Sequence, residues 1–470
     1  MNDRTKVARA ARGVACPAVA VAAALALVGC VKTEGTQTST DSTSRASSTV
    51  ASVACAPDNG GITLPDGFCA TVFADTIGHA RHIVVNTNGD VYINTWSGPY
   101  YQGPTHPGGF LVALRDTNGD GKADIIRRFG PDARQRNGGG TGIALYKGSL
   151  YAEEGDTLAK RIVRYALSAD SLAPTSTASE TIVGGLPFND DHPMHPFVID
   201  GSGNIYMDVG SATNSCQVKN RTLQSPGKRP CTELDTRAGI WHYDANRANQ
   251  RFSPAERYAT GIRNAVGIAL DPSGQLYSTQ HGRDQLRESW PKLYTAEQGQ
   301  NLPAEELLKV EQGADYGWPY CYYDPSQRKL VLAPEYGGDG GKALGECGSK
   351  KGPEAFFPAH WAPDGLFFYT GSAFPAHYNG GAFLAFHGSW NRAPGPQEGY
   401  SVAFVPIVAG KAVDAADYEI FADGFAGATK QPDAAAHRPV GVAQGPEGAL
   451  YITDDKGGRV WRVVYKGTAR

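Results

Sequence analysis

The sequence predicts an all-β fold, a six-bladed β-propeller of four-stranded antiparallel blades. One strand–turn–strand phrase recurs six times along the chain. Glycine and proline are also abundant, with 58 and 30 among 470 residues, as expected of many short strands joined by turns. Radial repetition leaves only short, protected sheet edges, so a ring of such hairpins is the natural architecture. A pair of β-sandwiches is the alternative, and six copies of one phrase argue against it.

Five phrases are regular: a strand, a turn with glycine, and a second strand that opens on an apolar residue and tyrosine. They are HIVVNTNGDVYINT (82–95), GIALYKGSLYAEE (142–154), PFVIDGSGNIYMDV (196–209), VGIALDPSGQLYSTQ (266–280) and VGVAQGPEGALYITD (440–454). The sixth, at 365–390, is degenerate because an insertion separates its strands. Further strands are expected within 110–129, 161–167, 239–245, 400–407 and 459–465. The best helix candidate is the short segment 304–310.

The first 30 residues have the features of an export signal. Basic residues are followed by an Ala/Val/Leu run that ends in Leu-Val-Gly-Cys, which resembles a bacterial lipobox with Cys30 as the lipidated residue. A plain signal peptide and an uncleaved anchor are the alternatives, although the run is short for a spanning helix. Residues 31–53 are Ser/Thr-rich and predict a tether, followed by the propeller over 54–470. The expected location is the bacterial cell envelope, lipid-anchored on the periplasmic side of the membrane.

Charge and cysteine content narrow the class further. Without residues 1–30 the net charge is −6, and no basic stripe predicts nucleic-acid binding. Six cysteines remain in that part, in three pairs that are local in sequence. An exported chain with an even count predicts disulfides, here 55–69, 216–231 and 321–347. Free thiols or a metal site are the alternative, but no Cys-x-x-Cys spacing occurs. The six are Cys55, Cys69, Cys216, Cys231, Cys321 and Cys347.

The chemistry is expected at one end of the central channel. In a propeller the innermost strand of each blade lines the channel, so the residues that precede these strands converge on one mouth. They are Arg81, His82, Thr141, His192, His195, Arg263, Asn264, His360, Asp364, His437 and Arg438. Arginines there suit a planar, multiply anionic ligand, since guanidinium pairs bidentately with carboxylates and stacks on rings. The alternative is that each side chain caps carbonyls of a neighbouring blade.

Four motifs resemble those of a known protein family, and the resemblance covers about residues 65–465. They are Asp191-His192 after GGLP, GIRNAVG at 261–267, HGRD at 281–284 and DYGWP at 315–319. In this order they resemble the soluble quinoprotein glucose/sorbosone dehydrogenase family, and GSWNR (388–392) and RPVG (438–441) look closer to its sorbosone-dehydrogenase-like branch. The resemblance implies a six-bladed propeller that uses pyrroloquinoline quinone (PQQ) and calcium. It also implies oxidation of a sugar or aldose, glucose or sorbosone, with a quinone or cytochrome as electron acceptor.

Carried over to this sequence, the resemblance assigns a catalytic role to His192. It would act as general base on a sugar hydroxyl, with a pKa suited to that task. Asp191 or Asp190 would orient it, and His195 is a rival base. Ser211 stands where the family has a channel aspartate, and Ala436 where it has a second late arginine.

The remaining family positions concern the cofactor and the metal. PQQ would be bound by Arg263, Asn264, Arg392 and Arg438, with Trp318 and Tyr316 as walls of the site. Calcium would bind the backbone carbonyls of Gly282 and Arg283, because calcium takes backbone oxygens as readily as carboxylates.

A separate loop, DTNGDGKAD, has oxygen donors at alternate positions and resembles a calcium loop. Its candidate ligands are Asp116, Asn118, Asp120 and Asp124. The twelfth position is Arg127 rather than glutamate, so the loop is not an EF-hand, and a tight hairpin turn is the alternative.

Two other functions compete with a sugar dehydrogenase. One is a lipid-anchored propeller that binds without catalysis. The other is a lactonase-like hydrolase that uses a calcium ion in the channel. A lactonase would be expected to hold its metal with channel-facing Glu, Asp and Asn side chains, which are sparse at the predicted mouth.

Overall fold

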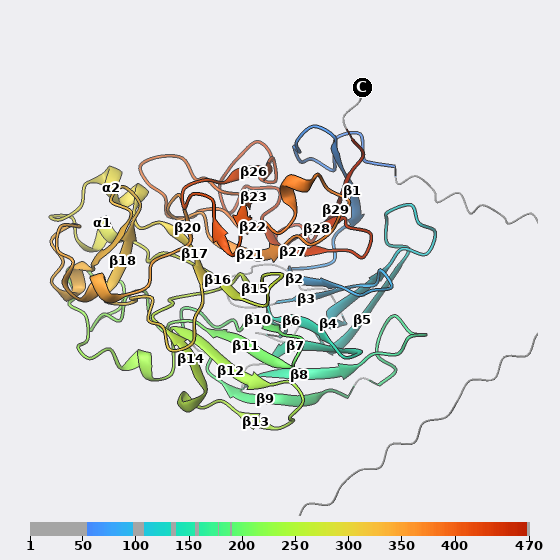
Figure 1. The fold of residues 1–470 in the computed structure, drawn as a ribbon, viewed down its shortest axis with the longest axis horizontal. Coiled ribbons are helices and arrows are strands. Elements are labelled where there is room, and N and C mark those ends of the chain that lie inside the picture. The colour runs from blue at the N-terminus through green and yellow to red at the C-terminus, as the bar shows by residue number, and fades with distance from the viewer. Residues whose placement is uncertain are drawn as a thin grey trace, which may run out of the picture. The chain divides into compact units, whose positions relative to one another are not determined.

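Six antiparallel four-stranded sheets stand in a ring in the computed structural model, which confirms the predicted six-bladed propeller (Figure 1). The structure describes residues 54–96, 108–132, 138–155, 159–176, 178–188 and 190–467. Cys30, the export signal and the tether lie outside these residues. Within them, no helix combines the length and the apolar character needed to cross a membrane.

The inner strands lie at the centre of the ring, and each contacts the next around the whole circle. They are β2 (Ala80–Val85), β6 (Ile143–Tyr146), β10 (Phe197–Ile199), β15 (Ile268–Leu270), β21 (Pro363–Phe368) and β27 (Pro439–Gln444). Each pairs with the second strand of its hairpin. These are β3 (Val91–Thr95), β7 (Ser149–Gly155), β11 (Asn204–Val209), β16 (Leu276–Gln280), β22 (Ala382–Phe386) and β28 (Leu450–Asp454). All six predicted hairpins are therefore confirmed.

Two more strands complete each blade. The third strands are β4 (Gly109–Arg115), β8 (Lys160–Ala166), β12 (Gly239–Asp244), β17 (Glu305–Lys309), β23 (Ser401–Val405) and β29 (Val460–Tyr465). The fourth are β5 (Ile125–Asp132), β9 (Glu180–Leu186), β14 (Arg257–Thr260), β20 (Ala355–Phe357), β26 (Glu419–Ala422) and β1 (Phe68–Ala74). The last blade thus takes its outer strand from the beginning of the described chain, with Phe68 opposite Tyr465.

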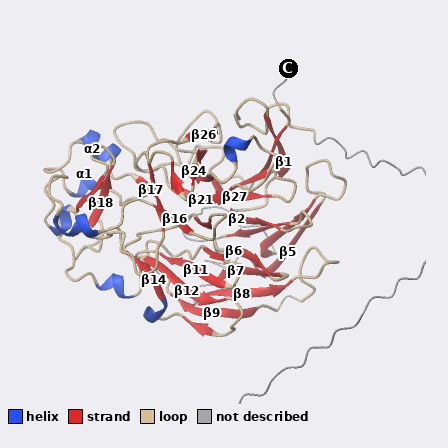
Figure 2. Cartoon of the chain, in the orientation of Figure 1, coloured by secondary structure: helices blue, strands red, loops and turns tan. Residues whose placement is uncertain are grey.

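A few small elements lie outside the blades (Figure 2). The strands are β18 (Cys321–Asp324), β19 (Lys329–Leu332), β24 (Ile407–Val408) and β25 (Lys411–Ala412). The short strand β13 (Gln250–Arg251) instead extends the second blade, where it pairs parallel with β9. The α-helices are α1 (Leu286–Ser289) and α2 (Ala296–Asn301). The 3-10 helices are Thr232–Asp235, Pro254–Glu256, Pro334–Tyr336, Gly345–Ser349 and Ala376–Tyr378.

The helix expected at 304–310 is wrong, because the segment forms strand β17. It pairs antiparallel with β16 on one side and β20 on the other. Glu305, Glu306, Leu307 and Leu308 are all buried. The two sheet partners and burial on both faces outweigh the helix propensity of these residues, because intrinsic propensity is overridden by tertiary contacts.

Apolar clusters fill the spaces between neighbouring blades. Side chains alternate across each strand, so every blade presents one apolar face to each neighbour. Full burial of a large side chain such as Phe110 or Phe357 stabilises the fold by about 1.5–3 kcal/mol. The predicted disulfides 55–69, 216–231 and 321–347 are all present.

Asp208 on β11 supports a stability prediction. Its side chain is fully buried, and burial raises its pKa well above the ordinary value. The folded state therefore keeps a proton that the unfolded chain releases. The free energy of unfolding that Asp208 contributes is fully present at low pH and is lost as the pH rises toward the folded pKa. Each unit by which the pKa is raised corresponds to about 1.4 kcal/mol in the free energy of unfolding. We expect Asp208→Asn to unfold at higher denaturant concentration than the parent at pH 8, with a gap that narrows toward pH 4.

Denaturant titration at several pH values measures this gap. The exposed Asp170→Asn variant is the control and should follow the parent throughout. Equal stability of Asp208→Asn and the parent at every pH would show that Asp208 is not held protonated.

Candidate active site

A cavity of about 470 Å³ lies at the mouth of the ring, where the inner strands begin. His192, Arg263 and Arg438 come from three different blades and all line it. The mouth predicted from the sequence therefore exists, and it brings these three residues together. The other predicted mouth residues on its wall are Arg81, Asn264, His360 and Asp364.

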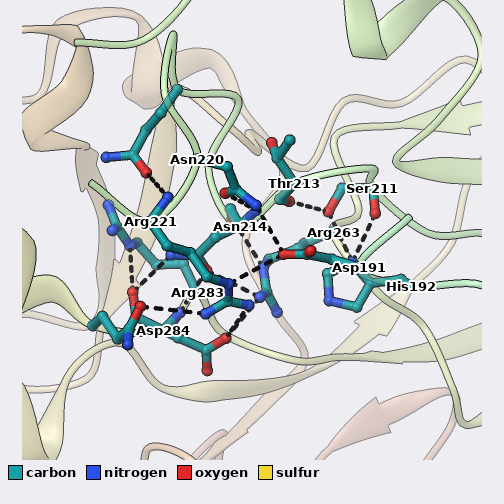
Figure 3. Close-up of polar contacts among 12 residues, drawn as sticks. Asp191, His192, Ser211, Thr213, Asn214, Asn220, Arg221, Arg263, Arg283 and Asp284 are labelled. Carbon is teal, nitrogen blue, oxygen red and sulfur yellow. Dashed lines mark hydrogen bonds and ion pairs between the residues drawn. The ribbon is translucent and has the colours of Figure 1, made fainter. Parts of the chain in front are cut away.

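His192 is held by Ser211, in the loop after β11 (Figure 3). Its Nδ1 lies 2.8 Å from the Ser211 carbonyl oxygen and 3.0 Å from Ser211 Oγ. The Ser211 hydroxyl donates its own hydrogen to the Thr213 carbonyl at 2.6 Å. Both neighbours of Nδ1 thus act as acceptors, so Nδ1 carries the ring proton and Nε2 keeps its lone pair.

Gly210 makes room for this arrangement. A Cβ at position 210 would lie 2.6 Å from the His192 Cβ, so a larger residue would displace the ring. Nε2 of His192 has no hydrogen-bond partner among the described residues, and the side chain lines the cavity. Burial and the positive charge of Arg263 lower the pKa of His192 well below its ordinary value. The imidazole is therefore a neutral base at neutral pH.

The aspartates expected to orient His192 are engaged elsewhere. Arg221 donates to Asp191 Oδ2 at 3.2 Å, and Asp190 forms an ion pair with Arg237. Asp191 lines the cavity, but Ser211 occupies the orienting position at Nδ1. Ser211, which departs from the family pattern, thus performs the positioning that we expected of a carboxylate.

His195, the rival base, is not among the residues that line the cavity. It is fully buried, with Nδ1 3.2 Å from Glu153 Oε1. Glu153 is also 3.3 Å from the buried Lys160 ammonium. This charged cluster is part of the support of the blade, and the position of His195 favours His192 as the base.

Arg263 is the centre of a buried polar cluster beside His192 (Figure 3). Its guanidinium donates to Asn214 and to Asp284 Oδ2, each at 3.0 Å, and to the Gly282 carbonyl at 3.1 Å. Arg221 donates to the same Asp284 oxygen. The two guanidinium groups hold the pKa of Asp284 below its usual range. Arg263 is thus a fixed, charge-paired wall residue.

Asn264 and Arg438 have unused polar groups at the same cavity. Arg438 donates to the carbonyls of His387 at 3.0 Å and Gly388 at 2.7 Å, and its guanidinium lies over the Tyr400 ring. No carboxylate forms a salt bridge with Arg438 in the described part of the chain. Within the same ranges the side-chain amide of Asn264 makes no hydrogen bond. Both side chains therefore have donors available to a ligand.

Three other predicted cofactor residues lie away from the cavity wall. Arg392 pairs with Glu398 at 3.3 Å and donates to the Pro396 carbonyl at 2.9 Å. Tyr316 is in the core, where its hydroxyl donates to the Lys309 carbonyl at 2.6 Å. Trp318 lies behind Arg263 and donates to the Asn214 carbonyl at 3.1 Å. The structure does not bring these three to the cavity, although Trp318 supports the Arg263 cluster.

The cavity floor contains a network that the sequence did not reveal. Arg81 donates to Asp364 at 3.0 Å and to Asp455 at 2.7 Å. His281 lies 3.1 Å from Asp364, and His387 lies 2.8 Å from Asp455. Arg81 and Asp364 were expected at the mouth, but the other members of the network follow the second strands of three blades. A His-Gly pair follows β16 and another follows β22, and this repeated pattern was the available signal.

Two calcium sites were predicted, one at the backbone carbonyls of Gly282 and Arg283 and one in the Asp116 loop. The Gly282 carbonyl accepts from Arg263, and the Arg283 guanidinium donates to Glu335 at 2.5 Å. In the Asp116 loop, Asp116 accepts amide hydrogens of residues 118, 119 and 121, and Asp124 accepts from Thr117. That loop is a self-bonded hairpin turn. No group of three or more His, Cys, Asp or Glu among the described residues is arranged to hold a metal, and calcium at backbone carbonyls stays a prediction.

Fold and site together define a six-bladed propeller with a polar cavity at its mouth that is lined by histidines, arginines and carboxylates. The family described as TrAA12-like matches residues 62–466, and the chain belongs to that family. A Borreliella burgdorferi protein without a functional name is 31% identical over 310 residues, 64% of this chain and 73% of that protein. The PQQ-dependent pyranose dehydrogenase of Coprinopsis cinerea is 30% identical over 167 residues, 31% of this chain and 21% of that enzyme.

Solved structures agree on the fold. A Trichoderma reesei carbohydrate-active enzyme of family AA12, solved with calcium, has a TM-score of 0.67 at 19% identity, over 86% of this chain and 97% of that one. The PQQ domain of the Coprinopsis cinerea pyranose dehydrogenase has a TM-score of 0.65 at 20% identity, with the same coverage. At these identities the likeness shows the propeller alone.

Proposed function

We propose that this protein is a PQQ-dependent sugar dehydrogenase. The observation that carries the proposal is that three polar groups without partners in the described chain face one cavity: Nε2 of His192, the amide of Asn264 and the free N–H groups of Arg438. A base and two sets of donors are what a sugar hydroxyl and an anionic quinone would require. The named relatives, including the Coprinopsis cinerea enzyme, support the same class.

The residues present suit a planar cofactor with several carboxylates. Arg438 would pair with a carboxylate, and Arg263 and Asn264 would bind ring oxygens. PQQ, when bound, supplies a quinone that accepts the hydride from the sugar carbon. Calcium at the carbonyls of Gly282 and Arg283 belongs to the same proposal.

His192 carries the proton chemistry. Its Nε2 would take the proton of the sugar hydroxyl, and the imidazolium would keep its Nδ1–H bonded to the Ser211 carbonyl. Ser211 therefore fixes the tautomer and the ring orientation throughout the step.

Purified protein reconstituted with PQQ and calcium tests the proposal. We expect dye reduction that depends on an aldose, with glucose, sorbosone and other pyranoses as the first substrates. PQQ binding without turnover on any sugar would favour a binding propeller. Calcium-dependent lactone hydrolysis without PQQ would favour the hydrolase.

The N-terminal sequence and the disulfides support a proposal for where the protein is located. We propose a lipid anchor at Cys30 that holds the propeller on the periplasmic side of the bacterial envelope. Three disulfides suit that oxidising compartment. A quinone or a cytochrome would accept the electrons there.

The low pKa of His192 predicts the pH dependence. The base must be neutral to act, and its pKa lies well below 6.5. We expect kcat/KM of the reconstituted enzyme to be constant from pH 6.5 upward and to fall only at lower pH, since that ratio reports the essential base. A kcat/KM that keeps rising through pH 7.5 would show that another group limits the reaction.

A further inference from the structure

The loop between Cys216 and Cys231 forms part of the rim of the cavity, and we call it the rim loop. Its charged residues are all basic, although the chain without its first 30 residues has a net charge of −6. Two large apolar side chains of the loop are open to solvent, with exposed fractions of 57% for Val218 and 60% for Leu223. An exposed apolar surface bordered by charges is typical of a contact site for a partner. The basic residues are Lys219, Arg221, Lys228 and Arg229.

Covalent and hydrogen bonds order the rim loop. The Cys216–Cys231 disulfide joins its two ends. The Lys228 amide donates to the Cys216 carbonyl at 2.9 Å, and the Val218 amide donates to the Pro226 carbonyl at 2.9 Å. A surface that is ordered in advance loses little conformational entropy when a partner binds it. The exposed side chains are therefore presented on a firm support.

The inner side of the rim loop reaches the cavity (Figure 3). Arg221 lines the cavity, where it donates to Asp191 Oδ2 at 3.2 Å and to Asp284 Oδ2 at 3.0 Å. The exposed Lys219 and Leu223 are each two residues from Arg221 in the sequence. A partner that lies on these two side chains would therefore come close to a group bound in the cavity.

Two cations of the rim loop are available to attract a partner. Arg221 is paired with carboxylates of the cavity, and Arg229 pairs with Glu346 at 3.0 Å. Lys219 is exposed and Lys228 is half-buried, and neither forms an ion pair with a carboxylate in the described part of the chain. Cations beside an apolar surface suit a partner that carries carboxylates around an apolar centre, and they attract it over long range.

We propose that the rim loop is the docking surface for a small redox protein with an acidic ring around the exposed edge of its haem or copper centre. This inference rests on the proposed function and adds the class of electron acceptor to it. Oxidation of one sugar releases two electrons and two protons. A haem or copper protein accepts one electron, so two partner molecules are reduced in turn and both protons pass to water.

The position of the rim loop favours a small protein over a membrane surface. Sugar enters through the mouth beside the loop, and a bilayer that lay on Val218 and Leu223 would cover this entrance. Electron-transfer partners form small, short-lived contacts, which suit a surface of two apolar side chains and two cations. A partner that leaves after each electron also leaves the mouth open to the next sugar.

Reduction of plastocyanin, a copper protein with an acidic patch, tests the docking surface on the reconstituted full chain. We expect its bimolecular rate constant to fall as salt is added, because salt screens the attraction. The double variant Lys219→Glu with Lys228→Glu should lower this rate constant about tenfold at low ionic strength. Leu223→Ser should lower it at high ionic strength as well.

Two controls accompany these variants. Lys411→Glu reverses an exposed charge on β25 and should match the parent with plastocyanin. Reduction of a small uncharged dye should be the same in all variants, because none of them changes a residue that lines the cavity.

A second measurement does not need turnover. Calorimetric titration of protein without PQQ at low ionic strength should show plastocyanin binding that the double variant weakens about tenfold. Such binding without turnover on any sugar would refute the dehydrogenase and keep the docking surface. The docking surface is overturned if plastocyanin does not bind, or if the double variant and Leu223→Ser leave its binding and reduction unchanged. It is also overturned if these variants weaken only binding to vesicles of anionic lipid.

Discussion

His192→Ala is expected to lower kcat by about 10²- to 10⁴-fold, the usual contribution of a positioned general base. The variant loses the Nε2 lone pair that faces the cavity, whereas Arg438 and Asn264 keep their donors. The PQQ dissociation constant should therefore stay close to that of the parent. Stopped-flow reduction of bound PQQ by a saturating sugar measures the chemical step, and titration of apoprotein with PQQ measures the affinity.

Two controls make this result specific. His377→Ala removes an exposed histidine paired with Glu419 and should leave kcat unchanged. His195→Ala disturbs the buried Glu153 cluster, so it should lower thermal stability, with kcat per folded molecule retained. If His192→Ala reacts at the rate of the parent, the base is a different residue.

Arg438→Ala is expected to weaken PQQ binding by about 10- to 100-fold, because a hydrogen bond to a charged group contributes about 1.5–3 kcal/mol. The remaining donors of this guanidinium are available to a carboxylate, since its described partners are two backbone carbonyls. Arg438→Lys keeps the charge and loses the bidentate guanidinium group. Its affinity for PQQ should therefore lie between those of Arg438→Ala and the parent. Calorimetric titration at fixed calcium concentration provides the dissociation constants.

Arg392→Ala is the matched control. Arg392 is buried, and its guanidinium is directed to Glu398 and the Pro396 carbonyl. We expect a lower melting temperature and an unchanged PQQ dissociation constant. Loss of affinity in Arg392→Ala equal to that in Arg438→Ala would assign both arginines to the cofactor.

The ring and its mouth could be predicted because they depend on local patterns that repeat. A hairpin of alternating apolar residues around a glycine turn specifies two strands, and six of them specify a ring. Equivalent positions before the inner strands then had to meet, which brought His192, Arg263 and Arg438 to one cavity. The cysteine pairs were predictable for the same reason, because each closes a short segment.

The partners of these residues could not be predicted, because they depend on contacts between distant blades. Ser211, not an aspartate, holds His192, and Asp455 reaches Arg81 across a sequence separation of 374 residues. Arg392 was placed by motif alone, and its own loop holds it away from the cavity. Strand β17 was missed because its Ala, Glu, Leu and Lys residues favour helix locally and form a strand only between two sheet neighbours.

The pairing of β1 with β29 has a consequence for biogenesis. The final blade joins residues 68–74 to residues 460–465, so a ribosome-bound chain that has been synthesised only to residue 445 contains β27 and β1 but the strand partner of neither. Closure must therefore wait until β28 and β29 have been synthesised, because an open ring leaves two blade faces uncovered.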